Sequence, residues 1–178
     1  IFWDKEPYVE NETTKIIDHV VYRLCYDYRN KEYHYDVYDW FDTQEAAATV
    51  EEINIVSEID GIKVKGIQCQ ATYDEQFNDI EHSYYKNHNY SVKKITLPDS
   101  IEMIGAAFFS ALDGLEELTL PAGIGFSSDR DFYDMESLRE VTFSSGDIVY
   151  LGGFKNCPKL EKVNYTGTIK AIGTEAFR

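Results

Sequence analysis

Hydrophobic residues recur at a nearly constant interval in the second half of the chain. Copies of one pattern begin at Val92, Leu115, Leu138 and Leu160, and the phenylalanines that close them are Phe109, Phe132, Phe154 and Phe177. Successive phenylalanines are 23, 22 and 23 residues apart. Apolar residues at fixed offsets and such a period are typical of a solenoid, in which each repeat buries its apolar side against its neighbours.

Each copy begins with a short segment in which apolar and polar residues alternate. In the second copy, Leu118 and Leu120 fall on one face and Glu117 and Thr119 on the other. This period of two predicts a strand, and we expect the copies to stack in parallel with their apolar residues, including the phenylalanines, as buried ladders. The outward positions then form columns, namely Lys93, Glu116, Arg139, Glu161; Lys94, Glu117, Glu140, Lys162; and Thr96, Thr119, Thr142, Asn164.

The first half of the chain has a different pattern. Residues 1–19 show no sustained period, which favours an irregular lead-in. Residues 20–28 and 33–40 alternate on either side of a polar turn, which predicts a β-hairpin, and residues 42–52 read as a short connector with one helical turn. The tyrosines and Trp40 of this hairpin suit a cap over the open end of the solenoid, or an aromatic platform that binds a sugar or a protein.

These patterns divide the chain into two parts. Residues 1–52 form the N-terminal lead-in and β-hairpin cap, and residues 53–178 form the repeat array, which we expect to be truncated at the C-terminus. The first repeat is irregular and is followed by an insertion at about 69–91, after which regular repeats run from residue 92. Insertions in repeat proteins often carry binding residues, and this one contains Tyr84, Tyr85 and His88.

Composition excludes several classes of function. The 32 acidic and 17 basic residues give a net charge of -15, which argues against a nucleic-acid partner and against anionic membrane surfaces. No apolar run is long enough to span a membrane, so we expect no membrane insertion. No catalytic or nucleotide-binding motif occurs, so we predict that the chain is not an enzyme.

Cysteine and histidine spacing gives no support for a metal or cofactor. The cysteines Cys25, Cys69 and Cys157 are widely spaced, so neither a disulfide framework nor a paired-cysteine metal site is indicated, and they read as free thiols packed as small apolar residues. A metal site built from Asp79, Glu81, His82 and His88 can be imagined, but its spacing matches no known pattern. We predict no cofactor and no metal.

The repeats resemble a known family. The segments ITLPDSIEMIGAAFFSALDGLEEL, YLGGFKNCPKLEKV and IKAIGTEAF are similar to the BspA type of leucine-rich repeat, LxxLxLPxxVxxIGxxAFxxCxxL. The resemblance implies an α/β, β-rich leucine-rich-repeat solenoid, right-handed, with short parallel strands on one face. It also implies a bacterial or protist protein, extracellular or at the cell surface, whose repeats serve adhesion or protein recognition without catalytic residues.

We therefore expect a monomeric binding module for a protein partner, either a host or extracellular-matrix protein or one with a basic surface. The candidate contact residues are Glu117, Glu140, Thr119 and Thr142 on the strand face, Tyr84, Tyr85 and His88 in the insertion, and Trp40 in the hairpin. A simpler interpretation of the strand face is a self-neutralised, solvated surface. Two other functions stay open: a structural spacer in a larger surface protein, and a carbohydrate-binding module that uses the aromatic hairpin.

Overall fold

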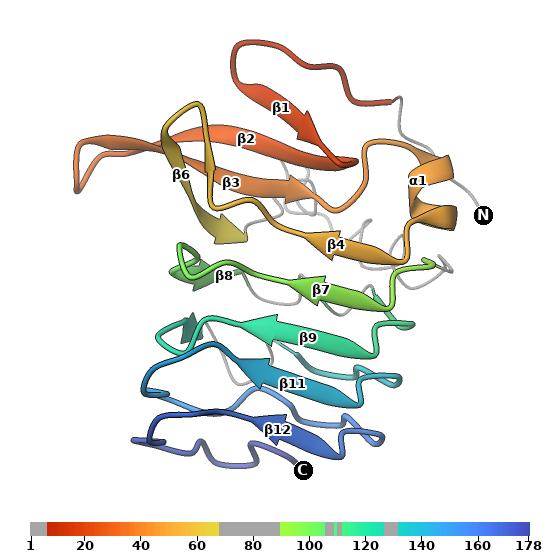
Figure 1. The fold of residues 1–178 in the computed structure, drawn as a ribbon, viewed down its shortest axis with the longest axis vertical. Coiled ribbons are helices and arrows are strands. Elements are labelled where there is room, and N and C mark those ends of the chain that lie inside the picture. Colours follow the sequence, from red (N-terminus) through yellow and green to blue (C-terminus); the bar gives the residue numbers. More distant parts are fainter. Residues whose placement is uncertain (1–6, 68–89, 106–108, 110–111, 127–131) are drawn as a thin grey trace, which may run out of the picture.

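The computed structural model describes residues 7–67, 90–105, 109, 112–126 and 132–178. Its elements in chain order are β1 (Thr14–Ile17), β2 (Val20–Asp27), β3 (Glu32–Asp39), α1 (Gln44–Thr49), β4 (Glu52–Asn54), β5 (Glu58–Ile59), β6 (Ile62–Ile67), β7 (Lys94–Thr96), β8 (Met103–Ile104), β9 (Glu117–Leu120), β10 (Gly125–Phe126), β11 (Glu140–Phe143) and β12 (Lys162–Asn164). Figure 1 shows β4, β7, β9, β11 and β12 stacked one above another, with β1, β2 and β3 at the N-terminal end.

The stacked strands form one parallel sheet in the order β12-β11-β9-β7-β4. Ile53, Ile95, Leu118, Val141 and Val163 are successive partners across it, and the first four are at most 2% exposed. This confirms the predicted parallel stacking and its register, and it places the irregular first repeat in line with the regular ones. Each strand buries one apolar face, so a shift by one residue would expose the whole column.

A second sheet joins the N-terminal hairpin to the repeats. Its order is β1-β2-β3-β6-β8-β10, and β5 pairs with β6. β3 is parallel to β6, β6 is parallel to β8, and Ile67 lies opposite Ile104. On the next strand, β10, Phe126 lies opposite Ile104. The hairpin and the first repeats therefore share one continuous sheet.

The predicted irregular lead-in is wrong for Thr14–Ile17. These residues form β1, which is antiparallel to β2 with Ile17 opposite Val20. The connecting residues Asp18 and His19 have φ angles of 47° and 71°, as in the two-residue turns whose twist suits a hairpin. Asp-His lacks the glycine that usually marks such a turn, and a four-residue strand is too short to show a clear period.

The phenylalanines of the repeats form a buried ladder, as predicted. Ring centroids are 5.1 Å apart between Phe109 and Phe132 and 4.8 Å apart between Phe132 and Phe154, and each of these side chains is at most 1% exposed. For Phe177 the predicted burial is wrong, because its ring continues the column at 5.9 Å from Phe154 but is 49% exposed. At the other end, Trp40 lies 5.2 Å from Phe109 and is 2% exposed. The hairpin therefore supplies the first ring of the ladder.

The connector contains the expected helical turn. α1 begins after Thr43, whose side chain accepts a hydrogen bond from the Ala46 N–H at 3.1 Å, and its Ala46 and Ala47 are buried. Tyr90 stacks on Phe41 at 5.1 Å, which ties the segment before β7 to the start of α1. No helix among the described residues has the length and apolar character that a membrane span requires.

Candidate binding surface and hairpin cluster

The outward face of the parallel sheet carries the predicted columns of charge. Lys93 pairs with Glu116 at 3.5 Å, and Arg139 pairs with Glu161 at 3.1 Å. Each partner lies on a neighbouring strand or just before it, so the ion pairs cross the sheet as the repeat spacing predicted. Their side chains are 44–65% exposed, so solvent and salt weaken these attractions and their contribution to stability is small.

Glu117 and Glu140 lie side by side at the centre of this face. They are direct partners on β9 and β11, an arrangement in which like charges repel. Each glutamate also pairs with a lysine on its other side. Lys94 Nζ lies 3.9 Å from the Glu117 carboxylate, and Lys162 Nζ lies 3.0 Å from the Glu140 carboxylate. The hydrogen bond from Lys162 is the main cause that lowers the pKa of the Glu140 carboxyl, and the hydrogen bond from Asn164 is the second. The carboxyl therefore stays ionised.

The column beside these acids is uncharged. Thr119 and Thr142 are direct partners on β9 and β11 and are half-buried. Asn164 donates to the Thr142 hydroxyl at 3.1 Å and to Glu140 at 2.5 Å, so the edge of the column is held in place. The predicted site residues of the strand face are therefore brought together on one surface.

An open groove of about 360 Å³ lies over the charged columns. Its lining consists of Glu116, Glu117, Arg139, Glu140, Glu161 and Lys162, which is four acidic and two basic side chains. Arg139 and Lys162 pair with Glu161 and Glu140 inside the groove, and Lys93 and Lys94 pair with Glu116 and Glu117 from beyond its lining, so the negative excess belongs to the lining residues alone. A cationic group therefore suits this groove better than an anionic one.

The other predicted contact residues are Tyr84, Tyr85, His88 and Trp40. Tyr84, Tyr85 and His88 lie outside the described residues, as does the alternative metal site. Trp40 requires a correction: we expected an exposed aromatic ring, but it is 2% exposed because it packs on Phe109. A core position leaves its ring inaccessible to a partner.

Other aromatic residues of the hairpin are exposed. Tyr26, Tyr28 and Tyr33 are 39%, 85% and 58% exposed. The ring of Tyr26 contacts those of Tyr28 and Tyr33 at centroid distances of 5.0 and 4.9 Å. These three residues, the tyrosine tip, lie next to the β2–β3 turn, which projects beyond the stacked strands in Figure 1. The hairpin contains many tyrosines, and the sequence pattern gave no reason to choose these three as candidate contact residues.

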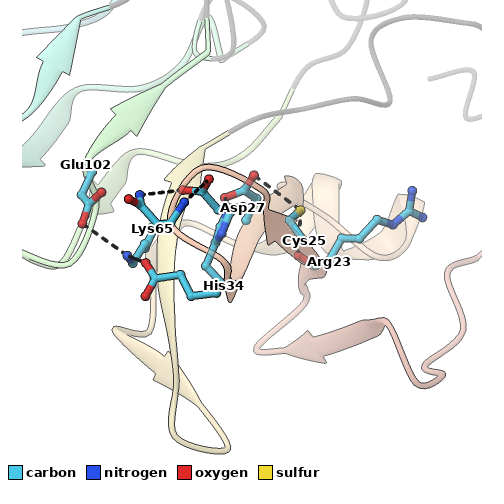
Figure 2. Close-up of polar contacts among 9 residues, drawn as sticks. Arg23, Cys25, Asp27, His34, Lys65 and Glu102 are labelled. Carbon is cyan, nitrogen blue, oxygen red and sulfur yellow. Dashed lines mark hydrogen bonds and ion pairs between the residues drawn. The ribbon is translucent and has the colours of Figure 1, made fainter.

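A second polar cluster lies on the β2–β3 hairpin itself. Cys25, His34 and Asp36 each place a potential ligand atom within 4.8 Å of the other two. The Cys25 S–H faces Asp36 Oδ2 at 3.6 Å, and His34 Nε2 lies 3.2 Å from Asp36 Oδ1 (Figure 2). We call these residues the hairpin triad. Cys25 and His34 are direct cross-strand partners, so the register of the hairpin brings the triad together.

Sequence reasoning missed the hairpin triad although its signal was present. The alternation of residues 20–28 and 33–40 places all three side chains on one face of the hairpin. Spacing along the chain hides the grouping, since nine positions separate Cys25 from His34. Cys25 is therefore not a thiol in an apolar core. Cys157 fits that description better, because it packs against the core and its S–H donates to the Phe132 carbonyl at 3.1 Å.

Burial dominates the acid–base behaviour of the hairpin triad. Loss of solvent raises the pKa of the Cys25 thiol to about 11, with a further contribution from the negative charge of Asp36. Burial also raises the pKa of the Asp36 carboxyl, and the nearby His34 acts in the opposite direction. Both groups are costly to ionise without a strong cation beside them.

Gly66 makes room for the Asp36 carboxylate. A Cβ built on Gly66 would lie 2.3 Å from Asp36 Oδ1, which is closer than any real contact of this kind. Gly66 is the partner of Asp36 across β3 and β6. The glycine in this strand therefore has a packing reason that the sequence alone did not show.

Comparison with known proteins identifies the repeats. A family model described as the BspA type leucine-rich repeat region, in six copies, matches residues 71–178. The chain belongs to the BspA-type leucine-rich repeat family. The BspA-type match includes β9, β11 and β12 and therefore the groove, whereas the hairpin triad and the tyrosine tip lie outside it. No curated protein matches the sequence significantly.

The chain is also similar to solved structures, and the first of these supports the leucine-rich-repeat fold. A leucine-rich repeat protein from Bacteroides capillosus matches with a TM-score of 0.50 at 15% identity, over 88% of this BspA-type chain and 100% of that one. A leucine-rich cell surface protein from Faecalibacterium prausnitzii matches with a TM-score of 0.44 at 16% identity, over 94% of this chain and 52% of the other. The pneumococcal vaccine antigen PcpA matches with a TM-score of 0.46 at 15% identity, over 95% and 52%. The right-handed winding and the capping role of the hairpin stay predictions.

Proposed function

We propose that this chain is a non-enzymatic protein-binding module of a bacterial surface or secreted protein, and that it contacts its partner through the outward face of the parallel sheet. The observation that carries this proposal is the groove over β9, β11 and β12, where four acidic side chains exceed two basic ones. Strands held in register by buried columns present these side chains on a rigid support, which lowers the entropic cost of binding.

The partner surface is expected to be basic at its point of contact. Glu117 and Glu140 repel each other across neighbouring strands, so a partner cation placed over them would relieve that repulsion. Lys94 and Lys162 already pair with these acids from outside. We expect such a contact to act mainly on the rate of association and on its dependence on salt.

Charge reversal tests this surface. Purified extracellular-matrix and host surface proteins are first screened for binding to the immobilised chain. For any protein that binds, the double variant Glu117→Lys, Glu140→Lys should weaken binding by about tenfold or more and abolish the loss of affinity with added salt, because it turns the negative excess of the groove lining into a positive one. Surface plasmon resonance at several salt concentrations provides both readouts.

A matched control separates the groove from net charge. Glu58 on β5 and Glu136 in the turn after Met135 are exposed and do not line the groove. The double variant Glu58→Lys, Glu136→Lys changes net charge equally and should leave the affinity nearly unchanged. Equal losses in both double variants, or no binder in the screen, would count against the proposed surface.

The tyrosine tip supports carbohydrate binding as a second candidate function. Exposed aromatic rings can stack on sugars, and Tyr28 is 85% exposed beside Tyr26 and Tyr33. We expect a glycan-array signal that Tyr28→Ala abolishes. Tyr165, which is 48% exposed after β12, provides the control, and Tyr165→Ala should retain the signal. An array without signal for the unaltered chain would rule this function out for the glycans tested.

A further inference from the structure

The hairpin triad combines three donor types in one small volume. A thiol, an imidazole nitrogen and a carboxylate meet there, with Asp36 between the other two at 3.6 Å from Cys25 Sγ and 3.2 Å from His34 Nε2. This order does not suit nucleophilic catalysis, in which the imidazole stands between thiol and carboxylate and takes the thiol proton.

We propose that Cys25, His34 and Asp36 bind a divalent transition-metal ion that has the same ligand preferences as Zn²⁺. Thiolate sulfur, imidazole nitrogen and carboxylate oxygen are the ligands that zinc takes in proteins. Three protein ligands leave one position of a tetrahedral ion for water or another ligand. This site is separate from the groove on the parallel sheet and does not depend on the proposed function.

The separations between the ligand atoms fit such an ion. With Zn–S near about 2.3 Å and Zn–O or Zn–N near about 2.0 Å, tetrahedral geometry places sulfur and oxygen roughly 3.5 Å apart and nitrogen and oxygen roughly 3.3 Å apart. Cys25 Sγ lies 3.6 Å from Asp36 Oδ2 and His34 Nε2 lies 3.2 Å from Asp36 Oδ1, so each distance ends on a different carboxylate oxygen. One ligand atom from each residue lies within 4.8 Å of the other two. The hairpin register therefore brings these atoms close to ligand spacing, and a small movement of the side chains would complete it.

The buried carboxylate provides an independent reason for a cation. The Asp36 side chain is 8% exposed, and Oδ1 is among the buried atoms of the described residues that lack a hydrogen-bond partner. His34 Nε2 lies within ion-pair distance of this oxygen, at 3.2 Å. An unsatisfied buried carboxylate oxygen is costly, and a metal ion would compensate it.

The neighbouring cations are directed elsewhere. The Arg23 guanidinium lies 3.6 Å from the centroid of the Tyr38 ring, and Figure 2 shows its side chain pointing away from the triad. Lys65 forms ion pairs with Glu32 and, at 3.8 Å, with Glu102. A divalent ion would neutralise both the Asp36 carboxylate and the Cys25 thiolate, because coordination deprotonates a thiol outright.

Metal titration of the intact chain tests the site. We expect the chelator-treated chain to bind one equivalent of Zn²⁺ by isothermal titration calorimetry and to melt at a higher temperature with Zn²⁺ than without it, since a ligand that binds the folded state stabilises it. Co²⁺ should give the charge-transfer absorption of a cobalt–thiolate bond, which reports directly on Cys25. No binding, or binding without that absorption, would overturn the proposal.

Variants identify the ligands and exclude other thiols. Cys25→Ser should abolish the cobalt–thiolate absorption, and His34→Gln should weaken Zn²⁺ binding by about tenfold or more, since even outer-shell changes cost 10–100-fold. Cys157→Ser is the matched control, because Cys157 is also a half-buried free thiol, and it should bind as the unaltered chain does. Asp36→Asn keeps the volume of the side chain and should also weaken binding. Retention of full Zn²⁺ affinity in Cys25→Ser, or its loss in Cys157→Ser, would contradict the site.

Discussion

Replacement of Phe132 by alanine is expected to lower the free energy of unfolding by about 3–5 kcal/mol, because Phe132 is a fully buried ring in the middle of the phenylalanine ladder. Its centroid lies 5.1 Å from that of Phe109 and 4.8 Å from that of Phe154, so the substitution leaves a cavity bounded by rings on both sides. Rigid strands on either side of the ladder limit how far the cavity can collapse. Urea unfolding followed by circular dichroism measures the effect.

The same substitution at the end of the ladder is the control. Phe177 is 49% exposed and contacts a ring of the ladder, Phe154, at 5.9 Å. Phe177→Ala should therefore cost well under half as much as Phe132→Ala. If Phe132→Ala costs less than about 1 kcal/mol, the range of surface substitutions, the ladder is not buried as described.

Replacement of Trp40 by alanine is expected to destabilise the chain by a similar amount, about 3–5 kcal/mol. Trp40 is 2% exposed and packs on Phe109, the first phenylalanine of the ladder. Its loss would open the junction between the hairpin and the first repeats, where β3 pairs with β6. Urea unfolding with hydrogen exchange at β3 and β6 would show both the global and the local effect.

This result separates a core role for Trp40 from a role in binding. A surface contact would leave stability almost unchanged when replaced, whereas a core residue would not. Tyr28→Ala is the matched control, because Tyr28 belongs to the same hairpin and is 85% exposed. Equal, small effects of Trp40→Ala and Tyr28→Ala would contradict the burial of Trp40.

The two surfaces that carry our functional proposals differ in how the sequence encodes them. The groove belongs to the repeats. Its residues lie at two adjacent offsets in successive copies, so the spacing of the copies predicts which side chains become neighbours. The hairpin triad occurs once, in a part of the chain without repeats. Its residues become neighbours through a single antiparallel pairing, in which Cys25 lies opposite His34.

The sequence by itself determined the repeat architecture. It predicted the parallel stack, the register that places Glu117 beside Glu140, and the burial of Phe109, Phe132 and Phe154. The physical reason is that each repeat buries its apolar face against a neighbour with the same pattern. The local period then determines both the strand and its partner.

Only the tertiary structure decided the features that depend on single long-range pairings. β1 forms because an Asp-His turn returns the chain onto β2, and Trp40 is buried because β3 joins the sheet beside β6. Burial also turned Asp36 from an apparent surface acid into a carboxylate held against Cys25, His34 and Gly66. An alternating pattern shows which side chains share a face of a hairpin. Whether that face is covered depends on which segments pack against it, and the pattern of one strand carries no information about those segments.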